Sequence, residues 1–196
     1  MRPAGSVPSG TPEQPPLALP PWSEPGGRHL GAAAGRDRVR TLVRLLQPGS
    51  ASRRAREVIR EVLRQAGLDD DAIADAELIV GELAANAERH GRPPFEVHVF
   101  SVDGVPAWCE IIDGDPDVHE VAIILDLLRS VREIGLPLLA EDGRGLLLAH
   151  RLSGGHCHVH SITTCTTGTP GKAVAFALPL SSSPRSDVPP GAGDGR

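Results

Sequence analysis

The sequence predicts a single α/β two-layer sandwich with a mixed, mostly antiparallel sheet. Three observations predict it. Two helical patterns follow one another between residues 50 and 90, a hairpin signal joins two apolar runs within residues 95–113, and two more short apolar runs lie near the C-terminal end. Amphipathic helices and strands must bury their apolar faces against each other, which gives two packed layers.

A short strand at residues 40–46 comes first and ends before Pro48-Gly49. Ser50 or Ser52 can cap the helix that follows. The apolar side chains of this helix recur at helical spacing and share one face: Ala55, Val58, Ile59, Val62, Leu63 and Ala66. Gly67 suits the position after the last helical residue, where a left-handed backbone is common.

The second helix starts near Asp71, in a run of aspartates that favours the positive end of a helix dipole. Gly91 and Pro93 end it after His90. Its predicted buried face consists of Ile73, Ala76, Val80, Leu83, Ala84 and Ala87.

A polar stripe runs along the edge of that face, because Glu82, Asn86 and His90 are spaced four residues apart. An amide oxygen at such an edge is a suitable ligand for Mg²⁺. A carboxylate one turn earlier could orient or deprotonate a nucleophile beside the metal. An ordinary amphipathic helix with a solvated polar edge explains the same spacing equally well.

The hairpin strands are expected at residues 95–102 and 105–113, on either side of Asp103-Gly104. The last two strands are expected at residues 156–164 and 172–178, with Thr169-Pro170-Gly171 as the turn between them. His156, His158 and His160 alternate along the first of these, so they share one sheet face. Two such imidazoles can chelate zinc, but a solvated or interface-facing strand is the favoured interpretation.

Two further motifs follow the hairpin. Asp113-Gly114-Asp115 is an acidic turn, and Gly143-Arg144-Gly145 opens an apolar helix. Glycine-rich turns at a helix start expose backbone N–H groups that can hold phosphate oxygens. Between the two motifs, apolar residues recur at helical spacing within residues 118–131. We interpret them as a helix packed on the domain's own surface; the alternative is a face for a partner or a second copy, which includes a homodimer.

The ordered set of Glu82-x-x-x-Asn86, Asp113 and Gly143-x-Gly145 resembles the nucleotide-binding boxes of the histidine-kinase-like (GHKL) ATPase superfamily. Within it, the chain looks most like the stand-alone anti-sigma-factor serine/threonine kinases. The resemblance covers about residues 39–180. It implies the GHKL fold, with helices on one face of the sheet, and ATP with Mg²⁺ as ligands.

The resemblance also implies roles for the residues of the helix stripe. Asn86 matches the residue that coordinates the Mg²⁺ bridging the phosphates. Glu82 matches the carboxylate that acts as general base or orients the attacking group. His90 matches a residue near the phosphate end of the cleft.

At the other boxes, Asp113 matches the aspartate that accepts the adenine amino group, and Gly143 and Gly145 match the lid glycines that admit the phosphates. Lys172 stands in a Gly-Lys pair before the last strand that many relatives show. Two departures concern nucleotide affinity. Asp115 replaces a glycine of the family pattern, and Ala173 is expected where many relatives carry an adenine-binding threonine.

The implied function is that of a kinase that transfers the ATP γ-phosphoryl group to a protein regulator. The implied partner is an anti-anti-sigma protein, a sigma factor or both, so the process would be transcription regulation. Two non-enzymatic alternatives stay open. One is an ATP-gated module that binds a partner without phosphorylating it, and the other is a scaffold that no longer binds nucleotide.

Composition sets the remaining expectations. The 196 residues are 40% hydrophobic and 23% charged, which suffices for one core, and the net charge of −5 gives no basic footprint for nucleic acid. No apolar run reaches the roughly 20 residues of a membrane span. Three cysteines without C-x-x-C spacing favour reduced thiols and a cytoplasmic location. Proline and glycine predict disordered arms at residues 1–35 and 181–196, around an ATP-binding domain at residues 36–180.

Overall fold

The computed structural model describes residues 39–130 and 144–178; both predicted arms and Gly143 lie outside these ranges. The strands are β1 (Val39–Leu46), β2 (Phe95–Val102), β3 (Val105–Asp113), β4 (Cys157–Thr163) and β5 (Pro170–Ala177). The helices are α1 (Ala51–Gln65), α2 (Asp70–His90), α3 (His119–Ser130) and α4 (Arg144–Leu152).

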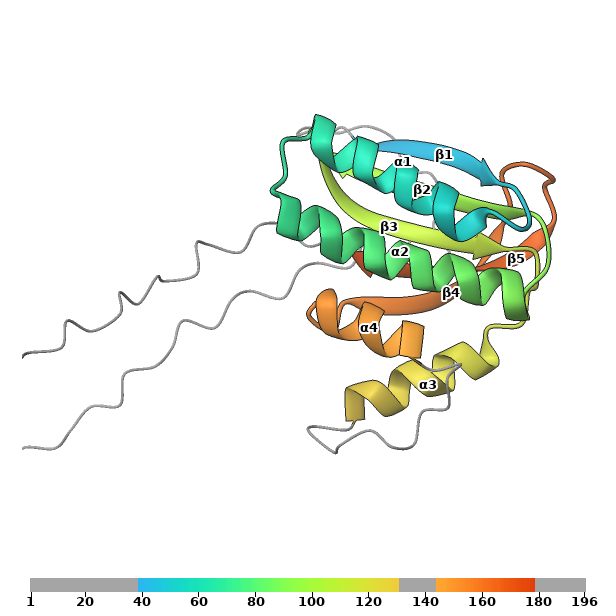
Figure 1. The fold of residues 1–196 in the computed structure, drawn as a ribbon. Coiled ribbons are helices and arrows are strands. Elements are labelled where there is room, and N and C mark those ends of the chain that lie inside the picture. The colour runs from blue at the N-terminus through green and yellow to red at the C-terminus, as the bar shows by residue number, and fades with distance from the viewer. Residues whose placement is uncertain (1–38, 131–143, 179–196) are drawn as a thin grey trace, which may run out of the picture. The chain divides into compact units, whose positions relative to one another are not determined.

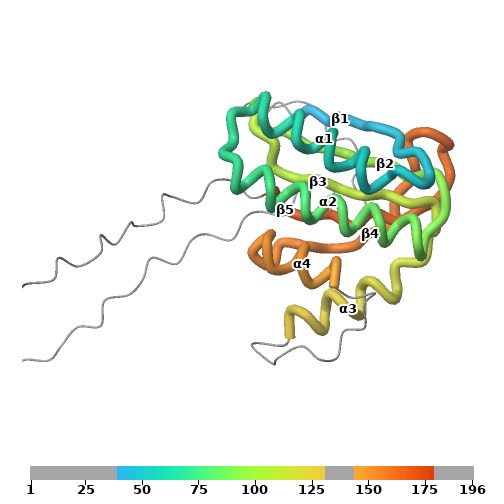
Figure 2. The backbone as a smooth tube through the Cα atoms, in the orientation of Figure 1, coloured from blue at the N-terminus to red at the C-terminus, as the bar shows by residue number. Residues whose placement is uncertain are grey.

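The described strands form one sheet in the order β1-β2-β3-β5-β4, and every pairing is antiparallel. The helices lie on one side of it in the order α1, α2, α4, α3 (Figures 1 and 2), and each contacts its neighbour in that order. The predicted α/β two-layer sandwich is therefore confirmed. Among the described residues, no helix is both long enough and apolar enough to cross a membrane.

The hairpin turn between β2 and β3 lies at Asp103-Gly104, as predicted. Asp103 and Gly104 have φ angles of 51° and 87°. Left-handed backbone at both central residues is the type I′ geometry that matches the twist of the two strands.

The turn between β4 and β5 lies earlier than predicted. Pro170 and Gly171 already pair with Thr163 and Ile162, so they belong to β5. The chain turns before them, where Gly168 has a φ angle of 68°. Proline is tolerated as the first residue of a strand, which is why it did not mark the turn itself.

The start of α1 is capped from another helix. Ser50 is the N-cap residue but makes no side-chain capping bond, and its hydroxyl donates to the Gln47 carbonyl instead, at 3.2 Å. Glu88 of α2 accepts from the backbone N–H groups of Gly49 (2.5 Å) and Ala51 (3.2 Å). A carboxylate at this positive helix end is stabilising, so Glu88 links α1 to α2.

The hydrophobic core lies between the helices and the sheet. Its largest fully buried side chains include Phe176, Leu46, Ile59, Leu63 and Ile79. Each such side chain contributes roughly 1.5–3 kcal/mol by leaving water. The predicted face of α2 is entirely buried, whereas Ala66, assigned to the α1 face, is the exposed C-cap.

Helix α3 packs on the domain through part of its apolar face. Leu125 and Leu128 are buried, while Ile123 and Leu127 are 48% and 56% exposed. Arg129 ties the helix to the sheet by donating to the Cys157 carbonyl at 2.7 Å. The packed-helix interpretation therefore holds for the inner side of α3, and an apolar outer side is left facing solvent.

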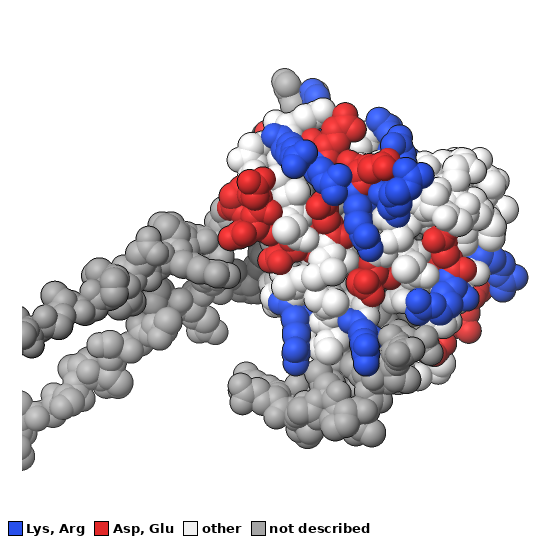
Figure 3. All heavy atoms as spheres, in the orientation of Figure 1, with Lys and Arg blue, Asp and Glu red and all other residues white. Residues whose placement is uncertain are grey.

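Charged side chains of both signs alternate over α1 and α2 on the face shown in Figure 3. Ion pairs join Arg53 to Glu57 within α1 and Arg60 of α1 to Glu77 of α2. Acidic side chains gather where α2 begins, at residues 69–71. This face carries no large field of positive charge.

Candidate functional site

The polar stripe of α2 lies at the edge of its buried face, as its spacing predicts. Glu82 and Asn86 are half-buried, and His90 is exposed at the end of the helix. At 1.5 Å of rise per residue, His90 lies roughly 12 Å along the axis from Glu82. Glu82 and Asn86 therefore form one local group, and His90 marks the far end of the stripe.

Gly145 brings the start of α4 against that group. A Cβ atom at position 145 would lie 2.6 Å from Asn86 Nδ2 and 3.2 Å from Glu82 Cβ. A side chain at this position would force the Asn86 amide to move, so glycine allows the two helices to approach with Asn86 in its present position. The first turn of a helix carries backbone N–H groups that lack helical partners, and such groups form many anion sites. Gly143, its predicted companion, lies outside the described residues.

Asp113 ends β3 and packs against the end of α2. A Cβ atom at Gly91 would lie 2.5 Å from Asp113 Cγ and 2.6 Å from its Oδ1. The carboxylate is thus placed just beyond the helical turn that carries Asn86. Burial raises the pKa of Asp113, although Lys172 and the Asp115 N–H group favour its ionised form.

Lys172 is the direct neighbour of that carboxylate. Its Nζ donates to Asp113 Oδ1 at 2.9 Å, and the two residues are cross-strand partners. Ala173 pairs with Ile112 instead, so alternation along β5 turns it to the opposite sheet face. Ala173 therefore does not share the sheet face of Asp113, whereas Lys172 does. The register of β3 against β5 decides this, and it was not readable from the sequence.

Asp115 adds less negative charge to the site than the sequence suggests. Arg92 Nη2 lies 3.1 Å from Asp115 Oδ1, and Lys172 Nζ lies 3.6 Å from Oδ2. Burial disfavours the ionised form of Asp115, but a bond from the Asp117 N–H group and both cations outweigh it and lower its pKa. The turn is a paired charge network rather than an isolated acid.

Two contributors were missed by sequence reasoning. Gly91 was interpreted only as a helix end, although it also makes room for Asp113. Arg92 was not singled out, although it pairs with Asp115. Both residues directly follow the polar stripe in the sequence, and this position could have indicated that they belong to the site.

The residues present fit a nucleotide with a hard cation. The Asn86 amide and the Glu82 carboxylate supply oxygen donors beside Gly145, at the start of α4. The buried Asp113 carboxylate supplies an acceptor at a distinct point of the same α2 edge. This separation suits a ligand with an anionic end and an amino-bearing base.

Comparison with known proteins identifies the family of the domain. The family model for the histidine kinase-like ATPase domain matches residues 47–169. The matched range holds Glu82, Asn86, Asp113 and Gly145, and ends before Lys172. No curated protein matches the chain.

Proposed function

Because the chain belongs to the histidine kinase-like ATPase domain family, an ATP-binding domain, we propose that it transfers the ATP γ-phosphoryl group to a serine or threonine of a protein partner. The observation that carries this proposal is the contact of Gly145 with Asn86 and Glu82. It brings an amide, a carboxylate and a helix N-terminus close together. These are the groups that positioning and charge neutralisation in phosphoryl transfer need.

At the phosphate end, the Asn86 amide oxygen would hold Mg²⁺, and the N–H groups of the first turn of α4 would hold phosphate oxygens. When bound, Mg²⁺ neutralises charge on the phosphoryl oxygens. Glu82, one turn before Asn86, would accept the proton of the attacking hydroxyl or steer it. His90 would lie toward the exposed end of this stripe, where a protein substrate can reach it.

At the base end, we assign Asp113 Oδ2 to the adenine amino group. Both described bonds to this carboxylate, from Lys172 Nζ and from the Asp115 N–H group, end on Oδ1. Adenine can therefore bind without displacing Lys172. A carboxylate acceptor selects adenine over guanine, because the matching position of guanine is a carbonyl oxygen.

The partner class rests on the family resemblance. The partner would be an anti-anti-sigma protein with a serine acceptor, a sigma factor that the chain binds, or both. Transcription would then depend on the phosphorylation state of the first partner. A cytoplasmic location and the absence of direct nucleic-acid binding belong to the same proposal.

One observation favours the alternative of an ATP-gated binding module without kinase activity. Ile123 and Leu127 expose an apolar side of α3, which packs against α4, the helix that carries Gly145. A partner, or a second copy of the chain, on this side would couple its binding to the nucleotide through α4.

A transfer assay separates the two functions. The full chain is incubated with Mg²⁺ and γ-labelled ATP, together with a purified single-domain partner that has a serine acceptor. Label on the partner supports the kinase. ATP binding and partner binding without label support the gated module. A chain that binds no ATP at millimolar concentration contradicts both.

A further inference from the structure

The sheet face opposite the helices carries buried polar side chains that the nucleotide cleft does not use. Glu96, His98 and Glu110 are all at most 3% exposed. Glu96 and His98 lie two residues apart on β2, so they share this outer face, and Glu110 is the cross-strand partner of His98. Burying two carboxylates is costly unless their charge is compensated.

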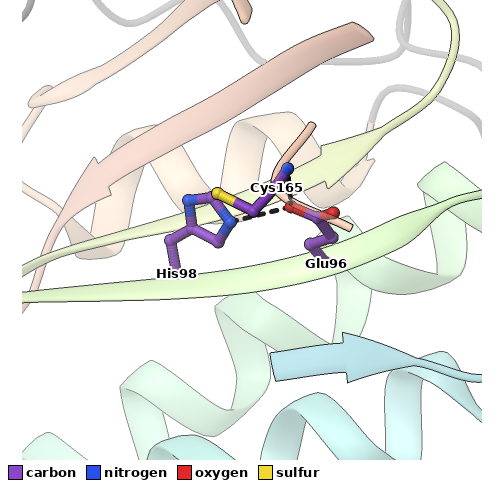
Figure 4. A group of neighbouring side chains, drawn as sticks. All are labelled: Glu96, His98 and Cys165. Carbon is purple, nitrogen blue, oxygen red and sulfur yellow. Dashed lines mark hydrogen bonds and ion pairs between the residues drawn. The ribbon is translucent and has the colours of Figure 1, made fainter. Parts of the chain in front are cut away.

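The turn between β4 and β5 brings a thiol to this group. One donor atom each from Glu96, His98 and Cys165 lie within 4.8 Å of one another (Figure 4). His98 Nε2 is 2.9 Å from Glu96 Oε2. In the described ranges, this is the one group of three or more metal-ligating side chains so close together.

The position of Cys165 is held by the backbone. Glu96 accepts from the Cys165 N–H group at 3.1 Å and from the Thr166 N–H group at 2.8 Å. The Thr166 hydroxyl donates to the same carboxylate at 2.5 Å. The turn is therefore fastened to β2, and the thiol is kept beside the imidazole.

We propose that Glu96, His98 and Cys165 bind a transition-metal cation, best suited to Zn²⁺. Thiolate sulfur, imidazole nitrogen and carboxylate oxygen are the zinc ligands of proteins, with bonds of about 2.0–2.3 Å. In a tetrahedron, such ligands lie roughly 3.3–3.8 Å apart, so small side-chain shifts close the described triangle. Binding releases the thiol proton, because the thiolate is the ligand. Cys165 is exposed, which leaves the fourth position open to water or another ligand.

A second carboxylate is placed to support the imidazole. His98 Nδ1 faces Glu110 Oε2 at 3.9 Å, on the ring side away from Glu96. This distance is too long for a hydrogen bond, and a small movement of the ring on binding metal would form one, which orients a metal-bound histidine and raises its basicity. His160 Nε2 lies 3.6 Å from the other Glu110 oxygen. The divalent charge would also offset the two buried carboxylates.

The alternating histidines of β4 are not ligands of the proposed zinc site, although their spacing in the sequence is compatible with a zinc chelate formed by two of them. His158 and His160 do share the outer face, where their rings stack at 5.4 Å. His156 precedes β4. The ligands come from β2 and from a turn about 70 residues later, which is a pairing that spacing along one strand cannot reveal.

Metal titration tests the site without nucleotide. The full chain, reduced and freed of metal, is titrated with Co²⁺ and then with Zn²⁺ against a chromophoric chelator. We expect one ion per chain and a cobalt–thiolate charge-transfer band. Cys165→Ser should abolish the band and weaken zinc binding by more than the roughly 10–100-fold that loss of a group supporting a ligand costs. Because Cys165 is exposed, this variant should keep the circular dichroism spectrum of the parent chain.

Two control variants define the result. His119→Gln removes an exposed histidine of α3, and Asn86→Ala alters the cleft; both should bind zinc like the parent chain. If Asn86→Ala removes zinc binding, the ion belongs to the cleft and the proposal fails. It also fails if the parent chain shows no thiolate band, or if Cys165→Ser binds zinc equally well. The outcome does not depend on kinase activity, so either proposal can fail alone.

Discussion

Lys172 Nζ and Asp113 Oδ1 form an ion pair at 2.9 Å in which both residues are at most 8% exposed. The pair joins the last strand of the sheet to the acidic turn after β3. It places a positive charge directly beside the carboxylate that we assign to adenine. Its loss would leave a buried charge without compensation.

Lys172→Met should therefore lower the free energy of unfolding by about 3 kcal/mol, the scale for breaking a buried pair. Urea denaturation at neutral pH measures this. The double variant Lys172→Met/Asp113→Asn should lose less than the sum of the single changes, because no buried charge remains. Full additivity would show that the two side chains do not stabilise each other.

Gly145→Ala should reduce Mg²⁺-ATP affinity by about tenfold, or about 1.4 kcal/mol, because the new Cβ atom would displace the Asn86 amide from its present position. Calorimetric titration measures the affinity. Arg151→Ala, at an exposed position near the other end of α4, is the matched control and should bind normally. If both variants bind Mg²⁺-ATP with equal affinity, the phosphates do not bind at the start of α4.

Glu82→Gln and Asn86→Ala should give different defects. Glu82→Gln should leave ATP binding nearly intact and slow phosphoryl transfer roughly 10²–10⁴-fold, because it affects proton transfer alone. Asn86→Ala should weaken binding, since it removes an oxygen ligand of the metal. Glu61→Gln, on the exposed side of α1, serves as the control. An unchanged transfer rate in Glu82→Gln would make Glu82 part of the solvated helix edge.

The chain should bind Mg²⁺-ATP and Mg²⁺-ADP in preference to guanine nucleotides. The buried Asp113 carboxylate accepts hydrogen bonds, and it repels the guanine carbonyl oxygen that would face it. Titration with ATP and GTP, with and without magnesium, gives the comparison. Equal affinities would exclude the adenine role of Asp113.

Stability of the metal-free chain should fall as the pH falls from 6.5 to 4. Burial, with nearby His160 and Arg129, lowers the pKa of His158 from 6.5 to about 4, and its ring packs edge-on against Trp108. The unfolded chain therefore binds more protons in this window, which lowers the free energy of unfolding by about 2–3 kcal/mol at its acidic end. His158→Phe should reduce the pH dependence of the free energy of unfolding, measured by urea denaturation. If the pH dependence is unaltered, it arises from other groups.

Local patterns predicted much of this protein correctly. The i, i+4 spacing of Glu82 and Asn86 placed both at the edge of a buried helix face, and Asp103-Gly104 placed the hairpin. The patterns failed where distant segments meet. The pairing of Asp113 with Lys172 depends on strand register, and the cap that Glu88 provides for α1 depends on how two helices pack. The group of Glu96, His98 and Cys165 depends on how the last turn folds back over β2.

The cap provided by Glu88 has a consequence for how the cleft can open. Glu88 lies two residues after Asn86 and is bonded to the start of α1, and Arg60 of α1 pairs with Glu77 earlier in α2. The two helices are thus joined at two points. The facing wall is α4, whose Gly145 touches Asn86. We therefore expect α4, rather than α1 and α2, to move when a nucleotide enters or leaves, so a ligand that fixes α4 would lengthen the residence time of the nucleotide.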